Sequence, residues 1–316
     1  MTSFTDAEAV TDAAEHTAVG EILTAFASFR EWDATLSQYS TVQANSPLSI
    51  DDAALQSFPV SQFAYAQLVV AFGCLESLRR MLVDEVEERI HVTSGPYGPY
   101  ALVRNALDSA ACALWLLEPA NSKLRIKRRI MAQMSEIHLA FQFRQEMNFP
   151  AHQWNRDYRA RMQEVADNAN IGPFDVSKRK MPATTAILKS LERLKRQPGV
   201  SWLGAWQLCS GHAHGKQWAT LMSNELTEIS RSASDLGAEY RITLSYASLA
   251  HVMAATTTMM QVACERYTLL AKTPPAAGQN HTGRRISPYS VSAVAPLFNL
   301  EARKLAVEAI RSTTGP

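Results

Sequence analysis

The chain has 316 residues, of which 47% are hydrophobic and 19% charged, and its formal net charge is +1. This composition excludes an intrinsically disordered chain, and the length allows a sizeable core in one large domain or two smaller ones. Only 13 glycines are present and the apolar-periodic segments are long, which favours helices over a β-rich fold.

Hydrophobic periodicity predicts helices from near the N-terminus onward. The first covers about 18–39, and the stretch SPLSIDDAALQSF (46–58) follows as a short helix in which Ser49 faces Asp52 in a variant capping box. A long amphipathic helix is expected from 61 to about 90, where the stretch TSGPYGPY ends it.

The second half of the chain continues in the same way. Pro99 suits the first turn of a helix that reaches about 118, and Asn121 or Ser122 can cap the next, which reaches about 148. Further helices are expected over 150–169, 183–196, 201–222 and 238–271. No segment alternates like a strand over more than a few residues.

Composition divides the chain into a body and an appendage. Residues 1–271 are expected to form a single all-α domain, a multi-helix bundle of about nine helices. Residues 272–290 have the composition of a linker, and residues 291–316 can form one short amphipathic helix as a C-terminal appendage.

Neither the cysteines nor the N-terminal residues indicate secretion. The four cysteines are far apart and form no CxxC motif, which fits a reducing compartment. The first twenty residues are acidic and lack a basic region followed by an apolar run. Residues 246–264 are uncharged and long enough to span a membrane, but their Ser, Thr, His and Gln residues favour a core helix. We expect a cytoplasmic protein without a membrane partner.

Charge is distributed unevenly along the chain. Residues 1–60 contain nine acidic residues and one basic residue, whereas residues 121–200 contain sixteen basic and seven acidic residues, a net charge of +9. Such asymmetry indicates either an acidic segment that folds back on a basic surface or a basic face for an anionic partner, and both interpretations stay open.

The helix expected to begin at Pro99 carries opposite charges in an apolar stretch. Arg104, Asp108 and Trp115 occupy positions 0, 4 and 11 of one helix face. A buried charge is costly unless it is paired, so we expect Arg104 and Asp108 to pair, either structurally or as part of a site.

The next helix begins with a basic run. Arg125, Arg129 and Glu136 occupy positions 0, 4 and 11 of one face, and His138 lies on a neighbouring face. Guanidinium groups match the geometry of phosphate, whereas a lone histidine among Met and Phe residues is more often a core residue. Part of the run is expected to be ordinary solvated surface.

The stretch CSGHAHGKQW (209–218) combines two histidines with two glycines. On a helix Ser210 lies one turn from Trp206 and one turn from His214, while His212 points away from His214. Imidazoles on opposite faces chelate poorly and no second ligand cluster is visible, so neither a metal nor another cofactor is expected. The glycines indicate a close approach of another backbone or a ligand, or the end of a helix.

These stretches resemble uncharacterised prokaryotic all-helical proteins related to the HEPN superfamily, some of which occur in abortive-infection contexts. The resemblance lies in LVRNALDSAACALWLLEP, the Arg-rich start and SEIH of the next helix, and WQLCSGHAHG, together roughly 60 positions. It implies a helical fold and an RNA or nucleotide ligand. Ribonucleases of the family carry an Arg that is followed by His four to six residues later on one helix. The pair in this sequence that comes closest to that spacing is Arg144 and His152, with seven residues between them, so ribonuclease activity is left open.

The first of three functional hypotheses is a protein that binds or acts on RNA or a nucleotide, in defence or regulation. Arg104, Arg125 and Arg129 would hold phosphate. His214 or His212 would act as general acid or base, oriented by Glu136 or Asp108. This hypothesis needs Arg104, Glu136 and His214 to meet around one cavity, and whether the protein is an enzyme, with hydrolase activity, stays open.

The alternatives use the same residues differently. A small-molecule enzyme or binding protein would have an apolar pocket between helices, in which polar groups such as Ser210 and His138 orient the ligand. The pocket would be lined by Trp115, Trp206, Met131, Met134 and Phe141. A helical interaction protein without chemistry, and a homodimer, are further hypotheses.

Overall fold

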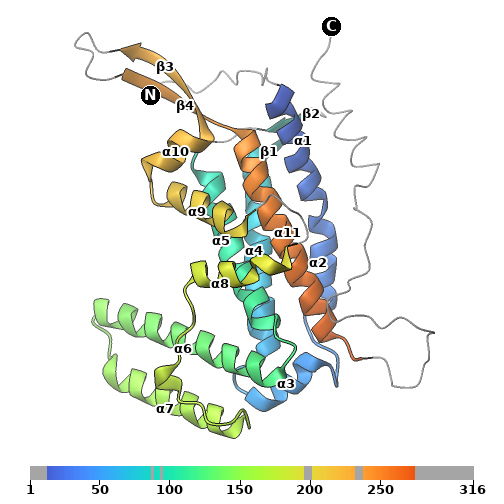
Figure 1. Cartoon of the computed structure of the whole chain (residues 1–316), viewed down its shortest axis with the longest axis vertical. Helices are drawn as coiled ribbons and strands as arrows, with labels where there is room; N and C mark the ends of the chain where they lie inside the picture. The colour runs from blue at the N-terminus through green and yellow to red at the C-terminus, as the bar shows by residue number, and fades with distance from the viewer. Residues whose placement is uncertain (1–12, 87–88, 93–94, 196–200, 232–237, 275–316) are drawn as a thin grey trace, which may run out of the picture.

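The structure is a computed structural model that describes residues 13–86, 89–92, 95–195, 201–231 and 238–274. It is predominantly helical, which confirms the predicted all-α multi-helix class (Figure 1). The predicted linker and C-terminal appendage lie, from residue 275 onward, outside the described residues.

The N-terminal half contains helices and one short hairpin. In chain order these are α1 (Ala13–Ala27), α2 (Phe29–Gln38), α3 (Pro47–Leu55), α4 (Val60–Leu82), β1 (Val83–Val86), β2 (Arg89–Val92), α5 (Gly98–Leu117) and α6 (Ser122–Glu146).

Among the described residues, the C-terminal half contains five further helices and a second hairpin. They are α7 (His152–Asn168), α8 (Thr184–Leu191), α9 (Trp202–Ala213), α10 (Gln217–Ser223), β3 (Asn224–Arg231), β4 (Ala238–Leu244) and α11 (Tyr246–Ala271), with single 3₁₀ turns at Val176–Lys178 and Glu192–Leu194.

Helix α5 is the centre of the core. Thirteen of its twenty residues are buried, and it packs against α4, α11, α9 and α8. Ala106, Ala110 and Ala113 are fully buried, and these small side chains let the neighbouring helices approach closely. Helices α4, α5 and α11 run side by side, while α6 and α7 form an antiparallel pair at one end and β3–β4 projects at the other (Figure 1).

Helix α11 is a core helix, as predicted for residues 246–264. Its N-terminus is capped twice: Ser245 accepts from Ser248 N, and the Glu15 carboxylate of α1 accepts from Tyr246 N at 2.5 Å. A carboxylate at this end also complements the helix dipole.

No single helix in the described part of the chain has the length and apolarity of a membrane span. Helices α3 and α4 have that length and apolarity only when taken together, and the chain bends by 112° between them.

Several predicted helix boundaries were wrong. The first predicted helix is interrupted at Ser28, which separates α1 from α2. The cap of α3 is Ser46, with Pro47 at the first helical position, and not Ser49, whose backbone N donates to Ser46 Oγ at 3.1 Å. The predicted start of α6, in contrast, is confirmed: Asn121 occupies its N-cap position, although the Asn121 side chain makes no hydrogen bond to the helix.

The structure also contains strands where the sequence showed no alternation over more than a few residues. The long helix ends at Leu82, and β1 and β2 form an antiparallel hairpin where the helix had been extended to 90. The segment from 238 begins with β4, and α11 starts only at Tyr246. Strand β3 is exposed at every position after the first, so neither of its faces is buried. Its sequence therefore lacks the alternation of apolar and polar residues by which a half-buried strand is recognised.

Candidate functional site

The segment CSGHAHGKQW (209–218) is the junction between α9 and α10. Helix α9 ends in a Schellman turn, in which Lys216 N donates to Gly211 O at 2.8 Å and Gly215 has a φ of 62°. The helices cross so closely that a Cβ at Gly211 would lie 2.7 Å from Ala219 Cβ. One glycine therefore marks a helix end and the other a close approach of two helices, which were the alternatives expected from the sequence.

The two histidines of this segment do not share a face. His214 is the exposed C-cap residue of α9, whereas His212 is buried and stacks on Tyr100 of α5, with ring centroids 3.9 Å apart. His212 Nε2 lies 2.6 Å from Ser223 Oγ of α10. Burial lowers the pKa of His212 below its ordinary value, which favours the neutral imidazole.

The predicted pairing of Arg104 with Asp108 is present, and it extends to α9. Arg104 Nε lies 3.8 Å from Asp108 Oδ2, and Trp206 Nε1 donates to Asp108 Oδ1 at 2.7 Å. The Arg104 guanidinium also lies 5.6 Å from the centre of the Trp206 ring. Burial raises the pKa of Asp108, while the Trp206 hydrogen bond and the charge of Arg104 oppose that rise. Ser210 follows Trp206 by one turn and is half-buried.

Arg125 is enclosed by protein partners. Its Nε and Nη2 donate to Asp51 at 2.6 and 3.1 Å, and its Nη1 donates to the carbonyls of Pro119 and Ala120. Asp51 is fully buried and also accepts from Ser122 Oγ at 2.5 Å. Burial raises the pKa of Asp51, and the hydrogen bonds from Arg125 and Ser122 oppose it. Asp51 thus ties the acidic N-terminal part of the chain to the basic segment.

Two further arginines cap the C-terminal end of α5. Arg128 Nη1 donates to Trp115 O and stacks over the buried Trp115 ring at 5.1 Å. Arg266 of α11 donates to the carbonyls of Leu117 and Glu118 at 2.8 and 3.1 Å. These guanidinium groups satisfy carbonyls that have no partner within the helix, at the negative end of its dipole.

Arg129 is buried, and no carboxylate of the described residues accepts a hydrogen bond from it. Its Nε donates to Pro59 O at 3.3 Å and its Nη2 to Gln133 Oε1 at 3.0 Å, while the guanidinium lies 4.4 Å from the centre of the Phe63 ring. Burial lowers the pKa of Arg129 to about 10. Like Arg125, it has its donors directed mainly at the protein interior.

The remaining predicted residues of α6 lie at the surface. Glu136 and His138 are exposed.

Cys112 of α5 is a further candidate nucleophile. Burial raises the pKa of the Cys112 thiol to about 12, and the charges of Glu136, Arg129 and Asp108 also act on it. The thiol is therefore protonated at neutral pH and is a poor nucleophile.

The described contacts do not bring Arg104, Glu136 and His214 together around one cavity. Arg104 is held between α5 and α9, Glu136 is exposed on α6, and His214 is exposed at the end of α9. Of the apolar residues expected to line a pocket, Trp115 and Met134 are buried in the core.

A different set of side chains gathers on the α6–α7 lobe, which we define as residues 122–180. Arg144 stacks on Trp154 at 5.2 Å and on Phe149 at 5.9 Å, and the rings of Trp154 and Tyr158 are 4.7 Å apart. Phe143 packs edge-on against Phe149 with ring centroids 6.4 Å apart. We call these five residues the aromatic–arginine strip.

Three rings of the strip face solvent, whereas Arg144 and Trp154 are half-buried. Phe143 is 59%, Phe149 47% and Tyr158 36% exposed, although aromatic side chains are normally buried. On α7, Arg161 follows Trp154 and Tyr158 at helical spacing and stacks on Phe58 at 5.5 Å. Arg161 thus places a further guanidinium group on α7 beyond the strip, next to the turn between α3 and α4 that carries Phe58.

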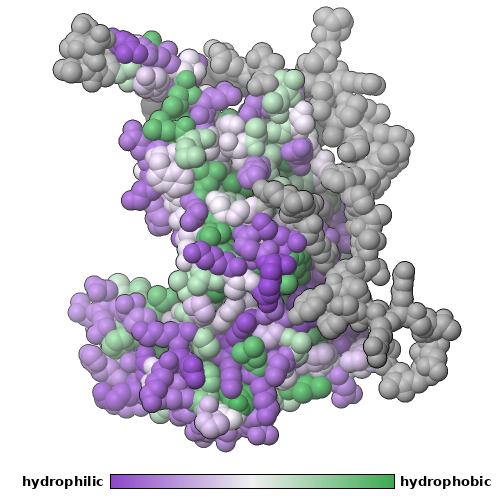
Figure 2. All heavy atoms as spheres, viewed as in Figure 1, coloured by the Kyte–Doolittle hydropathy of each residue, from purple (hydrophilic) through white to green (hydrophobic). Residues whose placement is uncertain are grey.

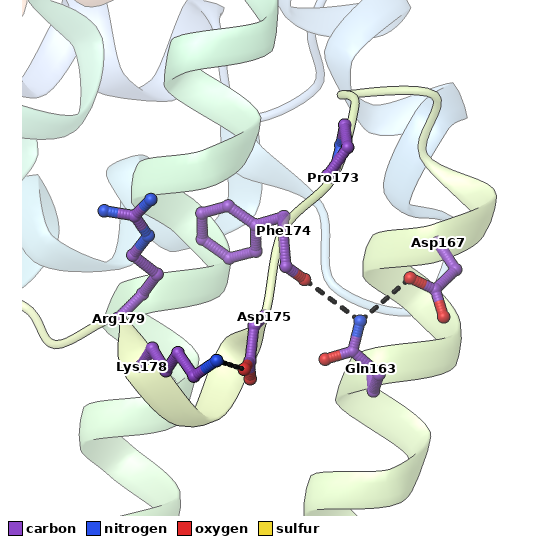
Figure 3. Close-up of a pocket in the computed structure, with 7 residues that line it drawn as sticks. All are labelled: Gln163, Asp167, Pro173, Phe174, Asp175, Lys178 and Arg179. Atoms are coloured by element: carbon purple, nitrogen blue, oxygen red, sulfur yellow. Dashed lines mark hydrogen bonds and ion pairs between the residues drawn. The ribbon is translucent and has the colours of Figure 1, made fainter.

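Two open depressions border this lobe. One, of about 480 Å³, is formed by the turn between α6 and α7 and is lined by Phe149 and His152, among others. The other, of about 550 Å³, lies beside the 3₁₀ turn that follows α7 (Figure 3). There Gln163 donates to Phe174 O at 3.0 Å, and Lys178 pairs with Asp175 at 3.2 Å.

The surface of the lobe is strongly hydrophilic and carries an excess of positive charge. Hydrophilic side chains dominate it in the view of Figure 2, interrupted by a few apolar ones. Residues 122–180 contain twelve Lys and Arg against six Asp and Glu, a net charge of +6. A cationic surface with exposed aromatic rings is the combination found where proteins bind single-stranded nucleic acid.

Comparisons with protein-family models, curated proteins and solved structures found no match to this chain. Within the described ranges, no three His, Cys, Asp or Glu side chains group as metal ligands would.

Neither the partners of His212 and Arg125 nor the aromatic–arginine strip was predicted from the sequence. Tyr100 and Ser223 are partners of His212, and Asp51 is the partner of Arg125, but they lie at distant positions in the sequence. The strip did have a sequence signal: Phe143, Phe149, Trp154 and Tyr158 are interleaved with Arg144, Arg156, Arg159 and Arg161.

Proposed function

We propose that this chain binds single-stranded RNA along the aromatic–arginine strip of the α6–α7 lobe. The observation that carries the proposal is the exposure of three rings, Phe143, Phe149 and Tyr158, in a cluster where the Arg144 guanidinium stacks on Phe149. Rings of this kind stack on unpaired bases, and each stacked base contributes about 1–3 kcal/mol. Burying the rings under bases would also remove apolar surface from water.

The charge of the lobe supports the same ligand. Arg156 and Arg161 on α7 and Lys178, Arg179 and Lys180 after it are exposed, so they can reach phosphate groups. Arg125, in contrast, has its donors bound to Asp51 and two carbonyls and contributes to stability. Phosphate binding is therefore assigned to these surface cations of the lobe in place of Arg104, Arg125 and Arg129.

The proposed activity is binding without cleavage. Neither His212 nor His214 has Glu136 or Asp108 among its partners in the described residues, so no general acid–base pair is oriented. An imidazole that is buried against Tyr100 also has no access to a phosphodiester.

The proposal includes a cellular setting. The four cysteines are free thiols, which fits the reducing cytoplasm expected from the sequence. RNA as the ligand agrees with the resemblance to HEPN-related proteins, which stays a hypothesis, as does a role in defence or regulation.

Fluorescence anisotropy with a labelled, unstructured RNA oligonucleotide tests the proposal. We expect binding whose affinity falls with salt, with a slope of log K against log [salt] of about −0.7 for each phosphate contacted. Phe149→Ala or Tyr158→Ala should weaken binding by about 5–150-fold, the range that corresponds to one lost stack. Arg161→Ala should make the slope less steep by about 0.7.

Two surface substitutions elsewhere serve as matched controls. Tyr97 is 46% exposed at the start of α5, and the side chain of Arg80 is 74% exposed on α4. Tyr97→Ala and Arg80→Ala should leave RNA binding unchanged. Equal losses in strip and control variants, or a preference for duplex RNA over single strands, would contradict the proposal.

A further inference from the structure

The hairpin β3–β4 leaves the helical body, and no further strand among the described residues lies along either of its edges. Its strands pair only with each other in the described part of the chain, and it projects beyond α10 and α11 (Figure 1). Leu226 is 38%, Ile229 55% and Tyr240 47% exposed. An isolated two-stranded hairpin is only marginally stable in water, and each free edge is a template for another strand.

The edge formed by β4 is complementary to itself. Opposite charges, Glu239 and Arg241, flank Tyr240, and the apolar residues Ala238 and Ile242 lie one position further out on either side. If a two-fold axis passes beside Tyr240, antiparallel pairing of two β4 strands sets Glu239 opposite the partner subunit's Arg241. The same register sets the two Tyr240 rings opposite each other and Ala238 opposite the partner subunit's Ile242. Opposite charges and aromatic pairs at directly opposed positions both stabilise sheets.

The edge formed by β3 lacks this property. Its pairing with β4 is interrupted by an irregularity between Glu228 and Ser230. A two-fold axis that set Glu225 opposite Arg231 would place two Glu228 side chains opposite each other, which is destabilising. Bulges and like charges are devices that keep an edge strand unpaired.

We propose that β4 pairs with β4 of a second copy of this chain, so that two hairpins form one four-stranded antiparallel sheet. The register of the hairpin sets Leu226 opposite Ile242, so one face of this sheet would carry Leu226, Ile242 and Tyr240 from both copies. Cross-strand pairs on that face add to the edge hydrogen bonds.

Helix α10 supplies further apolar surface next to the hairpin. Its Trp218 is 46%, Leu221 54% and Met222 76% exposed, and apolar side chains gather where α10 meets the hairpin (Figure 2). A sheet extension alone buries little area, and specific interfaces generally bury more than about 1,000 Å². Because α10 contacts β3, this apolar surface adjoins the proposed interface and can extend it.

Charge reversal at β4 tests the proposal. Sedimentation equilibrium of the full chain should show a dimer of the 34.9 kDa subunit. Glu239→Arg and Arg241→Glu should each weaken the dimer about tenfold or more, because each sets like charges opposite each other twice. An equimolar mixture of the two variants restores both pairings, so native mass spectrometry should detect the heterodimer in preference to either homodimer.

The double variant Glu239→Arg/Arg241→Glu restores the pairings within one sequence and serves as the control for folding. It should dimerise like the unmodified chain, even if a single variant folds poorly. The proposal is overturned by a chain that stays monomeric up to about 100 µM, by a dimer that both single variants leave unchanged, or by a mixture and a double variant that both fail to recover.

Discussion

The imidazole ring of His212 lies parallel to the phenol ring of Tyr100, with planes 5° apart and centroids 3.9 Å apart. Ser223 Oγ donates its proton to Ala219 O at 2.8 Å, so His212 Nε2 is the donor in its 2.6 Å contact with Ser223. His212 Nδ1 is buried without a hydrogen-bond partner in the described residues. A second proton on this ring would therefore have no acceptor.

The first prediction concerns pH. Because burial lowers the pKa of His212 in the folded state, the unfolded state binds the proton more readily. The contribution of His212 to the free energy of unfolding should be fully present above pH 6.5, the ordinary histidine value, and should fall as the pH drops below it, by at most about 1.4 kcal/mol per pH unit. Urea unfolding between about pH 5 and pH 8 measures this dependence.

Two variants isolate the contribution of His212 from that of other histidines. His212→Phe keeps an aromatic ring on Tyr100 and removes the titrating group, so its stability relative to the unmodified chain should improve as the pH falls. His214→Phe changes an exposed residue and should leave the pH dependence as it is. A pH dependence that survives His212→Phe unchanged would refute this assignment.

The second prediction concerns the crossing of α9 and α10. In Gly211→Ala the new Cβ would lie 2.7 Å from Ala219 Cβ and 2.8 Å from the Trp218 ring, so the helices must separate. We expect a loss of about 1–3 kcal/mol in the free energy of unfolding. Gly73→Ala on α4 is the matched control: nothing lies near its Cβ position, and it should stabilise by up to about 1 kcal/mol. Equal effects in thermal unfolding would show that the crossing is not tight.

The third prediction concerns the buried pair of Asp51 and Arg125. Asp51→Ala would leave the Arg125 guanidinium buried without its carboxylate, and should destabilise the fold by about 3–5 kcal/mol. Glu76 on α4, which pairs with Arg79 and Arg80 near the surface, is the comparison, and Glu76→Ala should cost about 1 kcal/mol or less for each pair lost. Chemical denaturation distinguishes the two; a small effect of Asp51→Ala would mean that water reaches Arg125.

The sequence was sufficient to predict what depends on neighbouring residues along one helix. The apolar composition of α5 and α11 marks them as core helices, and the spacing of Arg104 and Asp108 predicts their pairing. Gly211 and Gly215 were correctly associated with a special backbone location, although only the structure separates their roles.

Features that depend on distant residues could not be predicted. Arg125 meets Asp51 across 74 residues, and Glu15 caps α11 across about 230. When these distant partners are unknown, the local sequence does not distinguish a buried structural arginine from an arginine that binds phosphate. The hairpin β3–β4 was not predicted because most of its residues face solvent, and apolar periodicity identifies only elements that have a buried face.

Photo-crosslinking tests RNA binding on the α6–α7 lobe most directly. An RNA oligonucleotide that carries photoreactive uridine is irradiated with the full chain, and the attached peptides are identified by mass spectrometry. Crosslinks at Phe149, Trp154 or Tyr158 are the predicted result, because these rings would lie against the bases. Crosslinks confined to the helices around α5, or none at concentrations where anisotropy reports binding, would contradict it.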